Sequence, residues 1–314
     1  PERHAGVAGA LNAGWRHCRG GLVARLDGDD IAHGERLRLQ LAYLEAHPSI
    51  AVLGGGFGTF RSTAELRQPC GRPGARRYRM ACHPLLARWR MLFSCSLAHP
   101  TVTMRREALA PDGEPPYPEG EEAEDHCLWL GLPMHLQLAN VADVVGYLRR
   151  HPGSRSASAA EAIRRSSYGA VRRFLAAHCG AAAGAEALTD GDVALLWGSR
   201  EAASAEQVQR ASRALDAAEA LFLRLADGGA GPAGGQALPA GFAEDFIGER
   251  SAALREYVRS SCSKLRGLVT VQSLAAGDLS SGAEMMKMWL KGGDGGLKSL
   301  GALINAGYTG QGPG

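Results

Sequence analysis

Residues 22–30 read L-V-A-R-L-D-G-D-D, an apolar run that ends abruptly in three carboxylates. The apolar part, residues 22–26, follows Arg19-Gly20-Gly21 and has the length and composition of a buried strand in an α/β sheet. Ligands of open α/β sheets bind beyond the carboxyl ends of the strands. The stretch therefore places clustered negative charge where a ligand would bind.

Three aspartates, Asp27, Asp29 and Asp30, form this acidic turn. Clustered carboxylates repel one another and raise each other's proton affinity unless a positive charge lies between them. A hard divalent cation such as Mg²⁺ or Mn²⁺ would fill that place, and the pattern then predicts an Asp-x-Asp metal site that holds a phosphorylated donor. A polar surface turn is the alternative, because Asp and Gly are ordinary turn residues.

The composition is that of a globular protein with one large or two modest domains: 314 residues, of which 45% are hydrophobic and 21% charged. A net charge of +3 is close to neutral and argues for neither a dedicated nucleic-acid binder nor a strongly anionic partner. Seven cysteines without a C-x-x-C pair predict free thiols and favour a reducing compartment. No apolar run approaches the roughly 20 residues of a membrane-spanning helix.

The sequence starts with Pro1-Glu2 rather than with Met. We therefore expect a fragment or a processed form, whose upstream targeting or anchoring segment is not visible. Localisation is left open on this basis, with the cytoplasm as the default.

The first half alternates between helical and strand patterns. A helix is expected over residues 6–18, a strand over 22–26, a helix over 35–46 with Leu37, Leu41 and Leu44 on its apolar face, and a strand over 50–53 that ends in Gly54-Gly55-Gly56. This alternation predicts a parallel sheet with crossover helices. Further helices are expected over 83–93 and 121–132, and further strands over 102–105, 136–141 and 144–148.

Alanine dominates the sequence after residue 158. Helices are expected over 159–179, 192–225, 242–274 and 283–291, with a flexible Gly/Ala/Pro linker over 227–241. We find no chemical motif in this half. The chain is thus divided into a domain of residues 1–158 and a helical, partly low-complexity region of residues 159–314.

Short motifs in the first half occur in the order in which one known family carries them. They are Ala10-Leu11-Asn12-Ala13-Gly14, Ala24-Arg25-Leu26-Asp27-Gly28-Asp29-Asp30-Ile31, Glu35-Arg36-Leu37 with Gln40, His99-Pro100-Thr101, Glu124-Asp125-His126-Cys127-Leu128-Trp129, and Arg149 with His151-Pro152-Gly153-Ser154. On these motifs, residues 6–158 resemble the family 2 glycosyltransferases of the GT-A fold. The sequence departs from the usual family pattern at Gly34, Cys127 and Leu148, where proline, aspartate and tyrosine are common.

The resemblance implies an α/β fold of the GT-A type, which is Rossmann-like, with a mixed, mostly parallel sheet and flanking helices. In that family the opening strands and much of the nucleotide-base pocket precede the first matched motif. We therefore expect residues 1–158 to be a partial catalytic domain that lacks its amino-terminal strands.

The resemblance also implies an activity, the inverting transfer of a sugar from a nucleotide-sugar donor to an acceptor hydroxyl. The donor would be a UDP- or GDP-sugar, the cofactor Mn²⁺ or Mg²⁺, and the acceptor a saccharide, a lipid or a protein. Neither a nucleic-acid partner nor a transmembrane segment in this chain is expected.

On the donor side, the resemblance implies Asp29 as the direct metal ligand and Asp27 as a contact to the ribose or the metal. His151 either approaches the metal or the diphosphate from the far side or is only a turn histidine. The other donor-binding candidates are Arg25, Asn12 and Arg149, of which the two arginines would support a carboxylate or a phosphate. Asp30 is expected to cap the following helix.

On the acceptor side, Asp125 matches the general base that takes the proton of the acceptor hydroxyl. Glu124 would position that base or bind the acceptor. Without the resemblance, both would be explained as acidic residues in the first turn of a helix, where they interact favourably with the helix dipole.

Three alternatives stay open at this point. The domain could be a non-catalytic remnant used for binding. It could be a different nucleotide-dependent enzyme, such as a sugar-1-phosphate nucleotidyltransferase, although the glycine- and arginine-rich phosphate loop of that class is not visible. The second half could be a helical interaction module attached to an enzyme.

Overall fold

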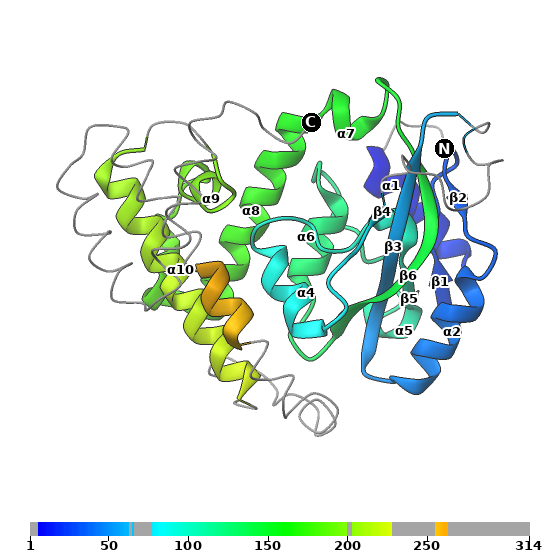
Figure 1. Ribbon diagram of the computed structural model, residues 1–314, viewed down its shortest axis with the longest axis horizontal. Helices are drawn as coiled ribbons and strands as arrows, with labels where there is room; N and C mark the ends of the chain where they lie inside the picture. The colour runs from blue at the N-terminus through cyan, green and yellow to red at the C-terminus, as the bar shows by residue number, and fades with distance from the viewer. Residues whose placement is uncertain (1–5, 63–64, 66–76, 200–202, 228–254, 263–314) are drawn as a thin grey trace. The chain divides into compact units, whose positions relative to one another are not determined.

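The computed structural model describes residues 6–62, 65, 77–199, 203–227 and 255–262 (Figure 1). The predicted helix over 283–291 and the predicted linker, apart from Asp227, lie outside the described residues. The described chain divides into two compact units, one up to Ala170 and one from Val171 onward. Helix α8 (Ala160–Cys179) contributes to both units, and the predicted domain boundary after residue 158 stays a prediction.

The first unit is a mixed α/β structure, as expected. Its helices are α1 (Gly6–His17), α2 (Arg36–Ala46), α4 (Pro84–Met91), α5 (Arg106–Leu109), α6 (Glu124–Gly131), α7 (Arg155–Ser158) and the start of α8, with the 3-10 helix η1 (His99–Thr101). Its strands are β1 (Leu22–Ala24), β2 (Ile31–Ala32), β3 (Ile50–Phe60), β4 (Arg77–Tyr78), β5 (Thr103–Arg105) and β6 (Gln137–Arg149). Each helix and strand that we expected in the first unit is present, several of them with shifted ends.

The sheet has the strand order β1-β5-β3-β6-β2, and β4 also pairs with β3. Strands β1 and β3 are each antiparallel to β5, so they run in the same direction, as a crossover through α2 requires. However, only β3 and β6 pair in parallel, and the other four described pairings are antiparallel. The expectation of a mostly parallel sheet is therefore wrong for the described strands, because short strands such as β5 are inserted between neighbours that run the other way.

Strand β3 continues through Gly54-Gly55-Gly56, where we expected it to end. A Cβ atom at Gly54 would lie 2.4 Å from Oδ1 of Asn140, and one at Gly55 would lie 2.6 Å from Cγ2 of Val145. These glycines therefore allow β6 to pack closely against β3 rather than ending the strand.

Strand β6 joins the two strands that we predicted over 136–141 and 144–148. Gly55 pairs with Val141 and Gly56 with Val144, so β6 carries two additional residues at this point. The irregularity is a bulge, which keeps the strand continuous while it bends. The bulge lies between the two predicted strands, which form one continuous strand in the structure.

Helix α2 buries a polar pair in addition to Leu44, which differs from the apolar face that we predicted. Arg36 and Gln40 are only 2% and 0% exposed, whereas Leu37 and Leu41 are 55% and 41% exposed. The reason is that the strand ends beneath α2 present backbone carbonyls, which an apolar side chain could not satisfy.

The buried polar pair of α2 ties three segments together. The Arg36 guanidinium donates to the carbonyls of Arg25 (2.8 Å), Pro100 (2.9 Å) and Val102 (3.0 Å). The side-chain amide of Gln40 donates to the carbonyl of Thr101 at 2.8 Å. Burial lowers the pKa of Arg36 to about 10, so the guanidinium stays charged at neutral pH. The acidic turn after β1 is thereby held against η1.

Helices cover both faces of the sheet, with α2 on one side and α4 and α6 on the other (Figure 1). The apolar core between α2 and the two central strands consists of Leu44, Ile50, Leu53, Ala139, Val141 and Val145. The six cysteines of the described chain are free, as predicted for them. They are Cys18, Cys82, Cys95, Cys127, Cys179 and Cys262.

The second unit is helical in its described part. It contains the end of α8, the 3-10 helices η2 (Gly180–Ala183) and η3 (Ala185–Ala187), and the helices α9 (Asp190–Leu196) and α10 (Ala205–Ala226). The single helix that we predicted over 192–225 is wrong, because Gly198, at φ +81°, follows the end of α9 and a capping box between Ser204 and Gln207 begins α10. Residues 255–262 are helical and lie inside a predicted helix. Within the described ranges, no helix combines the length and the apolar character that crossing a membrane requires.

Candidate functional site

A cavity of about 590 Å³ opens in the first unit, beyond the carboxyl end of β1. Most of its lining comes from four segments: the acidic turn, η1 with the residues before it, the start of α6, and the end of β6 with the turn that follows. Every predicted site residue except Asn12 takes part in the lining, namely Arg25, Asp27, Asp29, Glu124, Asp125, Arg149 and His151. The structure thus brings together residues that are more than 100 positions apart in the sequence.

The acidic turn is compact. Carboxylate oxygens of Asp27, Asp29 and Asp30 lie within 4.8 Å of one another. Two nitrogens of the Arg25 guanidinium contact Asp27, Nη1 at 2.8 Å from Oδ2 and Nη2 at 2.5 Å from Oδ1. The arginine is largely buried and the aspartate is not, so Arg25 fixes the orientation of Asp27 in the cavity lining.

Asp30 joins the acidic turn to β6. Its Oδ1 accepts a hydrogen bond from the backbone N–H of Arg149 at 2.8 Å. Burial raises the pKa of Asp30 to about 6, and the charges of Asp27 and Asp29 add to this rise. The predicted role of Asp30 as a helix cap is wrong, because the chain enters β2 directly after it, and Glu35 stands at the N-cap of α2.

The end of β6 brings two further predicted residues to Asp29. Nε2 of His151 lies 3.2 Å from Oδ2 of Asp29. Nε of Arg149 donates to the backbone carbonyl of Asp29 at 3.2 Å, while its guanidinium lies over the ring of Phe60, 5.2 Å from the centroid. His151 therefore faces the acidic turn, which a histidine in an isolated turn would not do.

The residues at this end of the cavity fit a divalent cation. Asp29 and Asp27 offer the hard carboxylate oxygens that Mg²⁺ and Mn²⁺ prefer, and His151 offers a nitrogen beside them. The raised pKa of Asp30 reflects burial beside other negative charges, a cost that a bound cation would reduce. Arg25 already neutralises part of the Asp27 charge, so Asp29 is the most available ligand.

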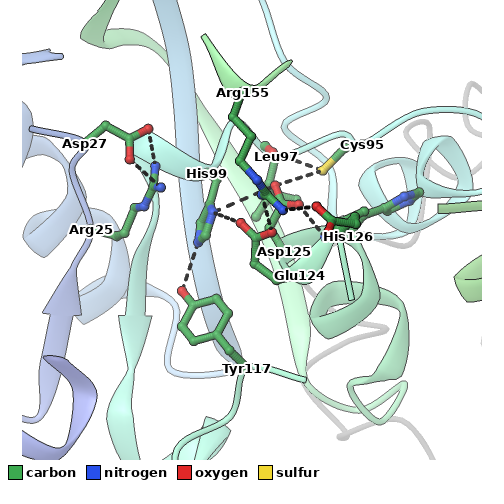
Figure 2. Close-up of polar contacts among 12 residues, drawn as sticks. Arg25, Asp27, Cys95, Leu97, His99, Tyr117, Glu124, Asp125, His126 and Arg155 are labelled. Carbon is green, nitrogen blue, oxygen red and sulfur yellow. Dashed lines mark hydrogen bonds and ion pairs between the residues drawn. The ribbon is translucent and has the colours of Figure 1, made fainter. Parts of the chain in front are cut away.

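The opposite end of the cavity holds a pair of carboxylates at the start of α6 (Figure 2). The Glu124 side chain is 6% exposed, whereas that of Asp125 is 23% exposed. Oδ1 of Asp125 accepts from the backbone N–H of His126 at 2.7 Å. Burial raises the pKa of both carboxyls, and the charge of Asp125 raises that of Glu124 further. Raised proton affinity and access to the cavity suit Asp125 to accept a proton.

His99 and Tyr117 support this pair, and sequence reasoning gave neither of them a role. Nε2 of His99 lies 2.9 Å from the hydroxyl of Tyr117, and its Nδ1 lies 3.7 Å from Glu124 Oε1 and 4.0 Å from Asp125 Oδ2 (Figure 2). Burial, with a smaller effect of Arg25, lowers the pKa of His99 well below its usual value, so its imidazole is neutral. The His99-Pro100-Thr101 motif marked this position, whereas Tyr117 lies in a loop without periodicity.

A third residue that sequence reasoning missed is Arg155, the first residue of α7. Its guanidinium donates to Glu124 Oε2 at 2.9 Å and to Glu122 Oε2 at 2.6 Å. His99, Glu124 and Asp125 are close enough to share a cation, but Arg155 already neutralises Glu124, and the charge of Arg25 also acts on Asp125. We therefore interpret this end of the cavity as a site of proton transfer rather than a cation site.

Asn12 lies outside the cavity lining. Its amide donates to the carbonyl of Tyr117 at 2.9 Å, and its Oδ1 accepts from the N–H of Tyr117 at 3.1 Å. The side chain is buried and holds the loop that delivers Tyr117 to His99. The predicted contact of Asn12 with the donor stays a prediction.

Sequence comparisons agree with this geometry. Residues 1–110 match the sequence family described as Glycosyl transferase family 2. The amino-terminal part of this chain is therefore similar to the family 2 glycosyltransferases.

Individual relatives are named as glycosyltransferases. The chain is 30% identical over 152 residues to the amylovoran biosynthesis glycosyltransferase AmsE of Erwinia amylovora. The matched region is 47% of this chain and 52% of that relative. The chain is also 30% identical over 153 residues to an uncharacterized glycosyltransferase of Haemophilus influenzae, covering 47% and 51%. A bifunctional glycosyltransferase, pgtA of Dictyostelium discoideum, is 27% identical over 184 residues, which are 49% of this chain and 23% of that protein. The chain thus spans about half the length of the first two of these relatives.

Proposed function

We propose that this protein transfers a sugar from a nucleotide-sugar donor to an acceptor hydroxyl, with metal assistance and with inversion at the anomeric carbon. The observation that carries the proposal is that one cavity holds both sets of groups that the reaction needs. An acidic turn with a histidine lies at one end, and a carboxylate pair of raised proton affinity lies at the other.

The donor end has to stabilise a departing nucleoside diphosphate. Asp29, Asp27 and His151 would hold a divalent cation, Mn²⁺ or Mg²⁺, which supplies positive charge against the diphosphate oxygens. Arg149 lies beside Asp29 and would contact the diphosphate directly, because its planar guanidinium suits phosphate oxygens. Arg25 orients Asp27 and keeps the acidic turn in shape.

The acceptor end has to activate a hydroxyl. Asp125 takes the hydroxyl proton while the acceptor oxygen forms a bond to the anomeric carbon and the bond from that carbon to the diphosphate oxygen breaks. The products are the glycosylated acceptor, the nucleoside diphosphate and a protonated Asp125. A single displacement with one base inverts the configuration, and no residue of this chain has to form a covalent intermediate.

Donor binding is the first test, because it does not require the acceptor to be known. Calorimetric titrations with a UDP-sugar and a GDP-sugar, with and without Mn²⁺, should show metal-dependent binding of one of them. Asp29→Ala should weaken that binding by more than tenfold. Asp143→Ala is the matched control, since Asp143 is exposed on β6 and lies outside the cavity lining.

Transfer itself is tested with the donor that binds and a panel of saccharide, lipid and peptide acceptors. Proton NMR of the product reports the anomeric configuration, which should be opposite to that of the donor. Absence of donor binding with either nucleotide would refute the transferase proposal and leave a non-catalytic domain. Retention of configuration would refute the single displacement through Asp125.

A further inference from the structure

Arg155 makes three contacts that no part of the proposed reaction has used so far. Nη1 donates to Glu124 Oε2 at 2.9 Å (Figure 2). Nη2 donates to Glu122 Oε2 at 2.6 Å and to the Glu122 backbone carbonyl at 2.9 Å. The Arg155 side chain is 36% exposed, whereas that of its partner Glu124 is 6% exposed. A buried carboxylate with a charged partner keeps its charge more easily than one without.

The place of Arg155 in the chain makes these contacts informative. It follows the turn after β6, so the segment that brings His151 to the donor end also brings Arg155 to the acceptor end. The first and second residues of α6 then differ in what they can do. Arg155 binds Glu124, whereas Asp125 keeps one oxygen directed toward His99 and Cys95 and is the more exposed carboxylate.

We propose that Arg155 is a positioning residue that holds Glu124 in place as a charged, hydrogen-bonded carboxylate and so leaves Asp125 as the carboxylate that accepts the acceptor's proton. This inference rests on the proposed transferase function and deepens it. Arg155 itself does not touch the reacting atoms. It acts through Glu124, and the ionised pair is the form that is competent for transfer.

The expected pH dependence follows from the charges around the pair. The groups that face it are Arg25 from the acidic turn, Cys95 and His99 from the segment through η1, Tyr117 and Glu122 from the loop before α6, and Arg155 from α7. Arg155 lowers the pKa of Glu124 against the effects of burial and of Asp125. Removal of the guanidinium should therefore raise the pH at which the pair binds its first proton. A proton shared by the pair weakens Asp125 as a base. As the pH is lowered, the variant should therefore lose activity at a higher pH than the wild type does.

The test compares Arg155→Met and Arg155→Lys with the wild-type chain. In Arg155→Met, the acid limb of the kcat/KM profile should move up by about 1 pH unit, as expected for loss of an opposite charge within hydrogen-bond distance. At the pH optimum kcat should fall about tenfold, while the affinity for the donor with Mn²⁺ stays within about twofold. Arg155→Lys keeps the charge, so it should restore the position of the acid limb.

A second readout does not depend on turnover. The carboxyl carbon of Glu124, assigned by its absence in Glu124→Gln, should titrate about 1 pH unit higher in Arg155→Met than in the wild type, as measured by carbon-13 NMR. Arg165→Met is the matched control, since it removes an exposed ion pair with Glu161 on α8. It should change neither the profile nor the titration.

The outcomes separate this proposal from the proposed function. If the Glu124 titration and the acid limb stay unchanged in Arg155→Met while the donor still binds, the positioning role is wrong and the transferase proposal stands. If the wild-type chain binds neither nucleotide-sugar, the transferase proposal fails, and the positioning role fails with it. The proposal would also be overturned if kcat fell, Arg155→Lys did not restore it, and neither the kcat/KM profile nor the Glu124 titration changed.

Discussion

Replacing Arg36 by methionine is expected to destabilise the first unit by about 3–5 kcal/mol. The Arg36 guanidinium donates to three backbone carbonyls, those of Arg25, Pro100 and Val102, and the residue is only 2% exposed. The carbonyls of Arg25 and Pro100 lose this donor at a cost of about 1–3 kcal/mol each, whereas that of Val102 keeps the backbone N–H of Arg25. Methionine recovers part of the apolar contact of the arginine stem. The sum is a large fraction of the roughly 5–15 kcal/mol that stabilises a domain.

Urea unfolding followed by far-UV circular dichroism measures this loss. Arg38→Met is the control in the same helix, because Arg38 is exposed and pairs with the exposed Glu35. Its removal should change the free energy of unfolding by less than about 0.5 kcal/mol. If Arg36→Met lost less than about 1 kcal/mol, the claim that this arginine fastens the acidic turn to η1 would be refuted.

Three further predictions test the site and the sheet. His151→Ala should weaken Mn²⁺-dependent donor binding about tenfold in calorimetry, while Mn²⁺-independent binding should stay as it is. Gly55→Ala should destabilise the protein by about 1–3 kcal/mol in urea unfolding, because its Cβ would lie 2.6 Å from Val145 Cγ2. The pKa of Asp30 is raised to about 6, so the metal-free protein should lose stability as pH rises from about 4 through 6. Asp30→Asn should lack this loss yet keep an acceptor for the Arg149 N–H, as thermal unfolding at several pH values would show.

Much of the donor end of the site could be predicted from the sequence, because the carboxylates of the acidic turn are close together in the chain. The acidic turn follows a recognisable strand, and the structure places its carboxylates together. The proximity of His151 to Asp29 could be expected only from the resemblance to a family. No local sequence pattern indicates which distant segment will lie beside the end of a strand such as β6.

Two of the errors, those on β3 and on α2, have a common physical cause, since each depended on a partner distant in sequence. The glycines of β3 suggested a strand end, and only the approach of Asn140 and Val145 explains why side chains are excluded there. Leu37 and Leu41 have helical spacing, but the carbonyls beneath α2 favour Arg36 and its neighbour Gln40 instead. Spacing describes one helix and cannot say what the surface beneath it requires.

The segment from the end of β6 to α7 explains why the two ends of the cavity can act together. Asp30 accepts from the backbone of Arg149, so the acidic turn is attached to the strand itself. A few residues later, Arg155 binds Glu124 at the other end. A shift of this segment would therefore change the acidic turn and the carboxylate pair of α6 at once. Because β6 is pinned along its length to β3 through the parallel pairing, the sheet limits such a shift, and the rigid core sets the distance across the cavity.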